Sequence, residues 1–459
     1  MISGGTMRKS RFESLFPRTM ARAGWRKVKR TLRLPRVIVG EIVGIAVAGV
    51  LGATIPQAGT SSVAQLARLR LHRPVVVALI DVFSLDHVFQ SPWFLGLMLL
   101  TTASLSIVVH EQVRRLRLMW SQRPTAAQLR GAPFRAEFER PSRLAATDGQ
   151  NDCKVEVRTR GRLGLAGSPV FHAGLLLVMV AGALRALFAV DAAVDLIEGE
   201  TLPPTAGAWA AQWPGVLGRP FRLAGPVRLD AVRATRYEGG NLRDLTVRVS
   251  LQRGNAVGVE EIGINRELRA PGGRLFLGSD FGPTALLEWR ENGKPPDRQA
   301  VLLASRGKGM YEAASLGPGR VRVFLRAQVD REGNRPEGVE VRVVRVVGEG
   351  SFPLLFVGLV PVGGEVSLPS GQTLTLHGVP YWARLRGSQD PALWLAYLGF
   401  TLVLVGASII FTVVKVDTCV VVTPAGDRER VFVALRPQRF TPLFQERFAR
   451  LVREQGGPA

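Results

Sequence analysis

The chain of 459 residues is longer than one typical domain and carries 60 Lys and Arg against 37 Asp and Glu, a net charge of +23. Nucleic-acid binding would require this excess on one folded surface, but it lies in three separate segments, 1–36, 110–168 and 415–459. These hold 11, 12 and 8 basic residues against 1, 6 and 5 acidic ones, whereas 191–390 holds 25 against 22. The charge therefore argues against a nucleic-acid partner, and two cysteines without a CxxC pair argue against thiol-redox chemistry.

Four apolar runs are expected to cross a lipid bilayer as helices, because about 20 apolar residues span its hydrocarbon core. The expected spans are 37–55, 93–109, 169–190 and 391–414. The segments between them alternate, since 1–36, 110–168 and 415–459 are basic whereas 56–92 and 191–390 are nearly neutral. By the positive-inside rule, both chain termini are cytoplasmic and 191–390 is extracytoplasmic.

In the first span, four small residues recur at four-residue spacing: Gly40, Gly44, Ala48 and Gly52. This stripe predicts a face against which another helix backbone packs closely. Glu41 lies about one turn inside the span, and its side chain is expected to snorkel to the cytoplasmic interface. In the loop 56–92, His87 precedes an aromatic run and is either solvated or in contact with a ligand.

The cytoplasmic segment 110–168 contains few large apolar residues and is interrupted by three prolines. We therefore expect it to bury little core and to lie along the membrane. Its end, 154–163, alternates in polarity and forms either a short strand or an interfacial lead-in to the third span. The tail 415–459 predicts a β run at 418–435 and an amphipathic basic helix near 441–454.

In 191–390 the apolar period changes from helical to alternating, as in 243–251, 320–329 and 339–347. Gly, Asn and Pro clusters separate these runs, which favours antiparallel strands joined by turns. A continuous apolar run, 354–360, predicts a buried strand. The predicted fold class is a membrane protein, α plus β, with four transmembrane helices and a large β-rich extracytoplasmic domain, a sandwich or open barrel-like sheet, between the third and fourth.

His172 lies in the first turn of the third span, where an ionisable side chain is costly without a partner. Two interpretations are open: His172 is a metal ligand, or its imidazole is hydrogen-bonded to a neighbouring helix and binds no metal. Arg185 is 13 residues further on, about 20 Å along a helix axis. It is therefore too distant to contact a group bound at His172 and is expected to snorkel to the outer interface.

Several stretches resemble the ResB (CcsB) family of the system II machinery for cytochrome c maturation. They are LGATIPQ (51–57), DVF to SPWFLGLMLL (81–100), FHAGLLLVMVAGAL (171–184) with LIEGE (196–200), GINRELRAPGGRLFLGSDFG (263–282) and LAYLGFTLVLVGASIIF (395–411). Their order along the chain matches the family's order. The chain departs from the family pattern at Arg266, where the family has a proline near this position.

The resemblance implies a bacterial inner-membrane subunit that handles haem, its cofactor or cargo, with a tryptophan-rich partner of the ResC (CcsA) type. The complex exports haem and delivers it to the CxxCH motif of apocytochrome c. The third-helix histidine of the family corresponds to His172, an axial ligand of haem iron, and Arg160 or Arg162 would hold the propionates. No P-loop, nucleophile elbow or metal-ligand motif occurs, so we expect a non-catalytic subunit of a cytochrome c synthase (haem lyase) complex.

Two alternatives remain. One is a scaffold of the same architecture that binds no haem itself. The other is a membrane-anchored envelope or sensor protein with a β-rich binding domain.

Overall fold

The computed structural model describes residues 27, 29–55, 57, 74–142, 153–238, 241–254, 256–303, 312–316, 321–327, 335–346, 352–369 and 371–458. Most of the basic segment 1–36, part of the loop 56–92, and 143–152 lie outside the described residues. The chain divides into two compact units. The first comprises Met1–Thr54, Ser91–Leu184 and Ala392–Ala459, and the second comprises Ile55–Gln90 and Arg185–Pro391.

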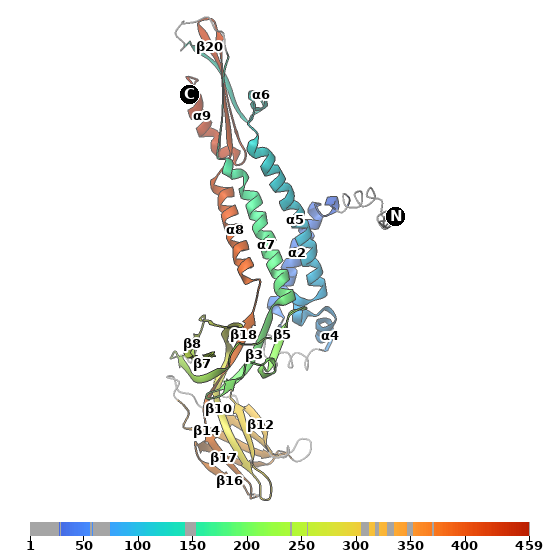
Figure 1. Ribbon diagram of the computed structural model, residues 1–459, viewed down its shortest axis with the longest axis vertical. Helices are drawn as coiled ribbons and strands as arrows, with labels where there is room; N and C mark the ends of the chain where they lie inside the picture. The colour runs from blue at the N-terminus through green and yellow to red at the C-terminus, as the bar shows by residue number, and fades with distance from the viewer. Residues whose placement is uncertain are drawn as a thin grey trace, which may run out of the picture. The chain divides into compact units, whose positions relative to one another are not determined.

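Four apolar helices are long enough to span a bilayer: α2 (Pro35–Thr54), α5 (Pro92–Ser121), α7 (Gly167–Phe188) and α8 (Leu393–Thr412). The four apolar helices predicted from the sequence are present among the described residues, and they run side by side (Figure 1). α5 continues past the predicted end at 109, because the basic stretch that follows contains no Pro or Gly to stop it. α7 ends before residue 190, since Val190 already pairs with Gln389 in a β-sheet.

The packing of α7 on α8 rests on glycines. A Cβ placed on Gly174 would lie 2.6 Å from the backbone nitrogen of Val403, and one on Gly406 would lie 2.3 Å from that of Phe171. Only glycine allows two backbones to approach so closely. The stripe predicted on the first helix packs in part: the space around Gly40 is open, whereas Gly44 contacts a leucine side chain of α5 and Ala48 is fully buried.

Glu41 of α2 is buried, with 5% of its surface exposed, and its Oε1 accepts a hydrogen bond from Ser104 Oγ of α5 at 2.7 Å. The prediction that Glu41 snorkels to the interface is therefore wrong. Because a carboxyl group in an apolar region requires a hydrogen-bond partner, the helix pair α2–α5 supplies one from its own interface.

The first unit also contains a four-stranded antiparallel sheet in the order β1-β20-β19-β2. Its strands are β1 (Phe134–Pro141), β2 (Lys154–Arg160), β19 (Val416–Ala425) and β20 (Arg428–Pro437). Two helices, α6 (Ala126–Leu129) and α9 (Gln445–Glu454), accompany it, with η4 (Thr441–Phe444) leading into α9. The segment 110–168 thus supplies two strands and a helix to a domain completed by the C-terminal tail.

This small domain has a core on each face of its sheet. Leu129 of α6 packs with Cys419 on one face, and Val452 of α9 packs with Val431 and Val433 on the other. Burial raises the pKa of the Cys419 thiol, so the thiol stays protonated and apolar. The prediction that 110–168 buries little core is wrong, because its few apolar residues meet apolar residues from a distant part of the chain.

The second unit is mostly β. In chain order its strands are β3 (Val190–Ile197), β4 (Thr201–Leu202), β5 (Ala211–Pro214), β6 (Val227–Arg236), β7 (Leu242–Arg253), β8 (Ala256–Gly263), β9 (Leu268–Ala270), β10 (Gly273–Arg290), β11 (Asp297–Leu302), β12 (Glu312–Leu316), β13 (Val321–Arg326), β14 (Gly338–Arg345), β15 (Leu354–Pro361), β16 (Glu365–Ser367), β17 (Thr373–Gly378) and β18 (Tyr381–Gln389). Short helices α4 (Pro74–Phe83), η1 (Leu85–Gln90) and η3 (Ala206–Ala208) complete the described part. The large β-rich region predicted from the alternating pattern is present.

Its strands form three sheets around two separate cores. One sheet has the order β4-β6-β7-β8, a second β12-β13-β14-β15, and the largest β16-β17-β10-β18-β3-β5, with β9 and β11 also paired to β10. The long strand β10 serves both cores: Leu275 belongs to the first, and Leu287 and Trp289 belong to the second. The single sandwich or barrel expected from the sequence is replaced by three sheets around two cores that share the strand β10.

The alternating runs place their apolar residues as predicted. Val247 and Val249 of β7 are fully buried in the first core, and Val323 of β13 is fully buried in the second. The run 354–360 is an exception: β15 is an edge strand, with Leu354 and Leu359 largely exposed. An apolar run alone does not distinguish a central strand from an edge strand.

Arg185 does not extend freely from the end of α7. Its guanidinium donates to Asp390 Oδ2 at 2.6 Å and to Asp191 Oδ2 at 3.0 Å. Asp191 stands where the chain enters the β region and Asp390 where it leaves. Arg185 therefore joins the first and last strands at the place where they meet the helices, rather than snorkelling alone.

Candidate functional site around His172

The elements before α7 place its first turn against the end of α8. The chain passes from β2 through Gly161, which has a φ of 71°, into the short helix η2 (Arg162–Leu165) and then into α7. A Cβ on Gly161 would lie 2.2 Å from the carbonyl oxygen of Val414, and one on Gly164 would lie 2.4 Å from that of Val413. These two glycines permit a close approach, which fixes where α7 starts and hence where His172 lies.

His172 is partly buried in α7, and one ring nitrogen is held by the backbone. Nδ1 lies 2.9 Å from the carbonyl oxygen of Ser168, one turn earlier. Since a carbonyl oxygen only accepts, this hydrogen bond requires a proton on Nδ1, and in a neutral imidazole that tautomer leaves the lone pair on Nε2. Among the described residues, Nε2 has no hydrogen-bond partner. A histidine that donates from one nitrogen to a carbonyl and presents the other as a free base has the second-shell arrangement usual for metal ligands.

A polar side chain from α5 completes this group. Gln112 Nε2 lies 3.4 Å from His172 Nδ1, and Gln112 Oε1 accepts from Ser168 Oγ at 3.3 Å. The sequence did not identify Gln112 or Ser168. A signal was present, because Gln112 is a polar residue just beyond the charge-free end of the second span, but nothing in a single sequence pairs it with the third.

Arg160 and Arg162 come shortly before α7 in the chain. Arg160 is exposed at the end of β2, and Arg162 is partly buried in η2. Neither makes an ion pair or hydrogen bond with any described residue. Five residues separate Gly167 from His172, about 7.5 Å along the helix axis. The structure therefore brings two uncompensated cations to the end of α7 at which His172 lies.

Two further histidines are held by carboxylates in the second unit. His87 of η1 has Nδ1 3.0 Å from Asp86 Oδ1 and is 42% exposed. His377 of β17 has Nε2 3.1 Å from Glu288 Oε2 and is 49% exposed. Hydrogen bonds from Arg298 and Arg290 hold the pKa of Glu288 down to about 2, so Glu288 stays charged. Neither histidine has the arrangement of His172, in which one nitrogen is held by the backbone and the other is unpaired.

The described part of the chain holds no group of three or more His, Cys, Asp or Glu side chains placed to share a metal ion. His172 thus offers a single imidazole donor. That donor suits a metal already held by four equatorial ligands, as iron is in haem, which takes one or two axial bases from protein.

A family model described as the ResB-like family matches residues 36–292, more than half of the chain. The chain belongs to the ResB-like family. A curated relative, named cytochrome c biogenesis protein CcsB, comes from Thermosynechococcus vestitus (strain NIES-2133 / IAM M-273 / BP-1). It is 26% identical over 390 residues, covering 82% of this chain and 83% of the relative. The family match begins at α2 and ends just after β10, so this ResB-like chain carries His172 inside the matched region.

Proposed function

We propose that this ResB-like chain is the haem-handling subunit of a cytochrome c biogenesis complex, with haem as cargo and His172 as one axial base. The observation that supports this most is the unpaired Nε2 of His172, set by the bond from Nδ1 to the Ser168 carbonyl. The name of the curated relative, a cytochrome c biogenesis protein, points to the same process.

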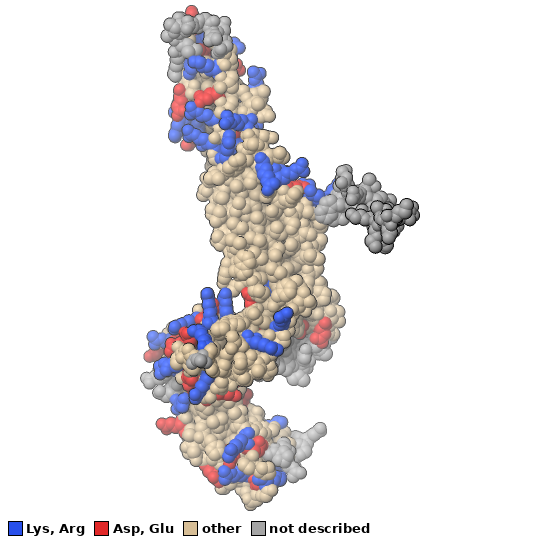
Figure 2. Space-filling model, in the orientation of Figure 1, with Lys and Arg blue, Asp and Glu red and all other residues tan. Residues whose placement is uncertain are grey.

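The proposed orientation places both termini in the cytoplasm of a bacterium and the second unit outside its inner membrane. It is supported by the charge of the segments, because the sheet β1-β20-β19-β2 and the N-terminal segment carry most of the basic excess. In Figure 2 a band of Lys and Arg borders the uncharged surface of the apolar helices at the end nearest this sheet. His172 then lies in the cytoplasmic half of the membrane, where haem is made.

The residues near His172 have separate roles in this proposal. The Ser168 carbonyl orients the imidazole by accepting from Nδ1, and Gln112 holds Ser168 by accepting from its hydroxyl. Iron binding requires the lone pair of a neutral imidazole. Arg160 and Arg162 supply positive charge for the two propionates. The second axial base comes from a tryptophan-rich subunit of the ResC (CcsA) type. The β-rich second unit of this chain holds apocytochrome c while the cysteines of the apocytochrome's CxxCH motif receive haem.

The test is the visible spectrum of the chain purified with its tryptophan-rich partner. His172→Ala is expected to remove most of the Soret absorbance per mole of complex, and exogenous imidazole is expected to restore it in His172→Gly. The matched control is His110→Ala, because His110 is an exposed histidine of α5 near the same end of the helices.

Soret absorbance that is unchanged in His172→Ala, or equally lost in His110→Ala, would contradict ligation by His172. If the complex still assembles but neither variant nor wild type binds haem, the chain is a scaffold without haem. If no partner co-purifies, the result favours the alternative function, a membrane-anchored protein with a β-rich binding domain.

A further inference from the structure

A second polar site lies on another side of α5. Lys29, Arg30, Arg33 and Glu111 line a cavity of about 380 Å³, at the small end of the range for ligand pockets of roughly 300–1,000 Å³. Glu111 is the residue before Gln112 on α5, and consecutive helix residues point about 100° apart. The cavity therefore opens on a different face of α5 from the one that meets His172.

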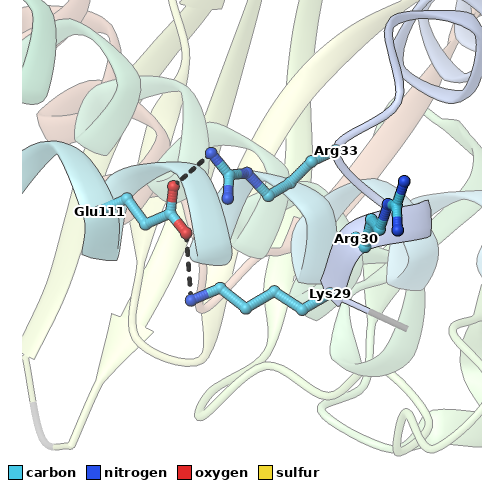
Figure 3. A pocket seen from close by; sticks show the side chains of 4 residues that line it. All are labelled: Lys29, Arg30, Arg33 and Glu111. Atoms are coloured by element: carbon cyan, nitrogen blue, oxygen red, sulfur yellow. Dashed lines mark ion pairs between the residues drawn. The ribbon is translucent and has the colours of Figure 1, made fainter. Parts of the chain in front are cut away.

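The charges in this cavity do not cancel. Figure 3 shows Glu111 between Lys29 and Arg33, with its carboxylate paired to both, at 3.1 Å to Lys29 Nζ and 2.7 Å to Arg33 Nη2. The Arg30 side chain has no ion pair or hydrogen bond with a described residue, and it is exposed. Three cations and one carboxylate leave two positive charges. The carboxylate pairs with two of the cations and leaves the third for an anion.

The position along the helices determines which anion can reach it. Arg33 precedes the start of α2 at Pro35 by two residues, and Glu111 follows the charge-free run of α5 by two. Both residues thus lie just outside the apolar runs of their helices, which is the depth of lipid phosphates in a bilayer. Basic pockets between helices at the cytoplasmic surface suit anionic headgroups.

We propose that Lys29, Arg30, Arg33 and Glu111 form a binding site for the phosphate of an anionic phospholipid headgroup in the cytoplasmic leaflet. Arg30 contacts the phosphate directly, while Lys29 and Arg33 add positive charge that their pairing with Glu111 partly neutralises. The site rests on the proposed membrane orientation but not on haem binding.

The test is native mass spectrometry of the full chain released from detergent micelles that contain either phosphatidylglycerol or phosphatidylcholine. We expect a phosphatidylglycerol adduct that phosphatidylcholine does not give. Arg30→Gln is expected to weaken phosphatidylglycerol binding about fivefold, the effect of one charge near a membrane surface. Arg117→Gln, an exposed arginine of α5 outside the cavity, is the matched control and should leave binding unchanged.

A second variant tests the site in the opposite direction. Glu111→Gln removes the competing negative charge and is expected to tighten binding by a similar factor, which a variant that merely loosens the fold would not do. Equal weakening by Arg30→Gln and Arg117→Gln, or weakening by Glu111→Gln, would overturn the proposal. Displacement of the lipid by inorganic phosphate would also overturn it, since the site would then take a free anion.

The Soret absorbance of the same variants separates this site from the proposed haem site. We expect Arg30→Gln to retain haem and His172→Ala to retain phosphatidylglycerol. Loss of haem in Arg30→Gln without loss of lipid would mean that the cavity holds propionates, which contradicts the lipid assignment.

Discussion

The packing of α7 on α8 can be tested by adding one methyl group to Gly406. A Cβ there would lie 2.3 Å from the Phe171 nitrogen and 2.6 Å from its Cα, all backbone that cannot rotate away. The helices would have to separate by about 1 Å to restore ordinary contact. Overpacking of this kind costs about 1–3 kcal/mol. We therefore expect Gly406→Ala to destabilise the helix bundle.

Gly49→Ala in α2 is the matched control, because Gly49 is also a glycine inside an apolar helix but nothing lies within 4 Å of its Cβ position. Alanine there should gain up to about 1 kcal/mol of helix propensity. Both free energies of unfolding come from titration with a denaturing detergent, followed by the helical circular dichroism signal. Equal shifts of the two midpoints in the same direction would refute the close packing of α7 and α8.

Two further perturbations test buried carboxylates. Ser104→Ala removes the hydrogen bond to Glu41 and should destabilise the helices by about 1–3 kcal/mol. Adding Glu41→Ala should recover part of that loss in a double-mutant cycle. If the two single-variant losses simply add in the double variant, the hydrogen bond between these residues is contradicted. Glu288 has a pKa of about 2 in the folded chain against a usual 4.5, so its stabilisation is present above pH 4.5 and is lost as the pH falls towards 2. The free energy of unfolding of wild type and of Glu288→Gln can be measured in urea by the circular dichroism of the β-sheets. The difference between the two should narrow as the pH falls from 4.5 towards 2, and a difference independent of pH would contradict the lowered pKa of Glu288.

Local patterns made much of the fold predictable. The four spans follow from the length and apolarity of single segments, and the faces of β7 and β13 follow from alternation within a few residues. The pairing of β2 with β19 joins Val157 to Cys419, and no local pattern encodes a partner so far along the chain. This is why the segment 110–168 was expected to lack a core.

The candidate site was predictable only in part. His172 stands out because an ionisable residue in an apolar run is costly. Its partners Gln112 and Ser168 become partners only when two helices are placed side by side. Glu41 was misjudged for the same reason, since its hydrogen-bond donor, Ser104, lies on another helix. Sequence locates the unusual residue, whereas packing decides what it contacts.

The long strand β10 has a consequence for dissecting the β region. Its first half carries apolar side chains for one core and its second half carries them for the other, with continuous backbone between them. The boundary between the cores therefore offers no linker at which the chain could be divided. A fragment that retains only one of the two cores keeps half of β10 with its apolar face and hydrogen-bonding edge uncovered, which favours aggregation. Deletion studies of this region should remove whole strands from the outer sheets rather than cut through β10.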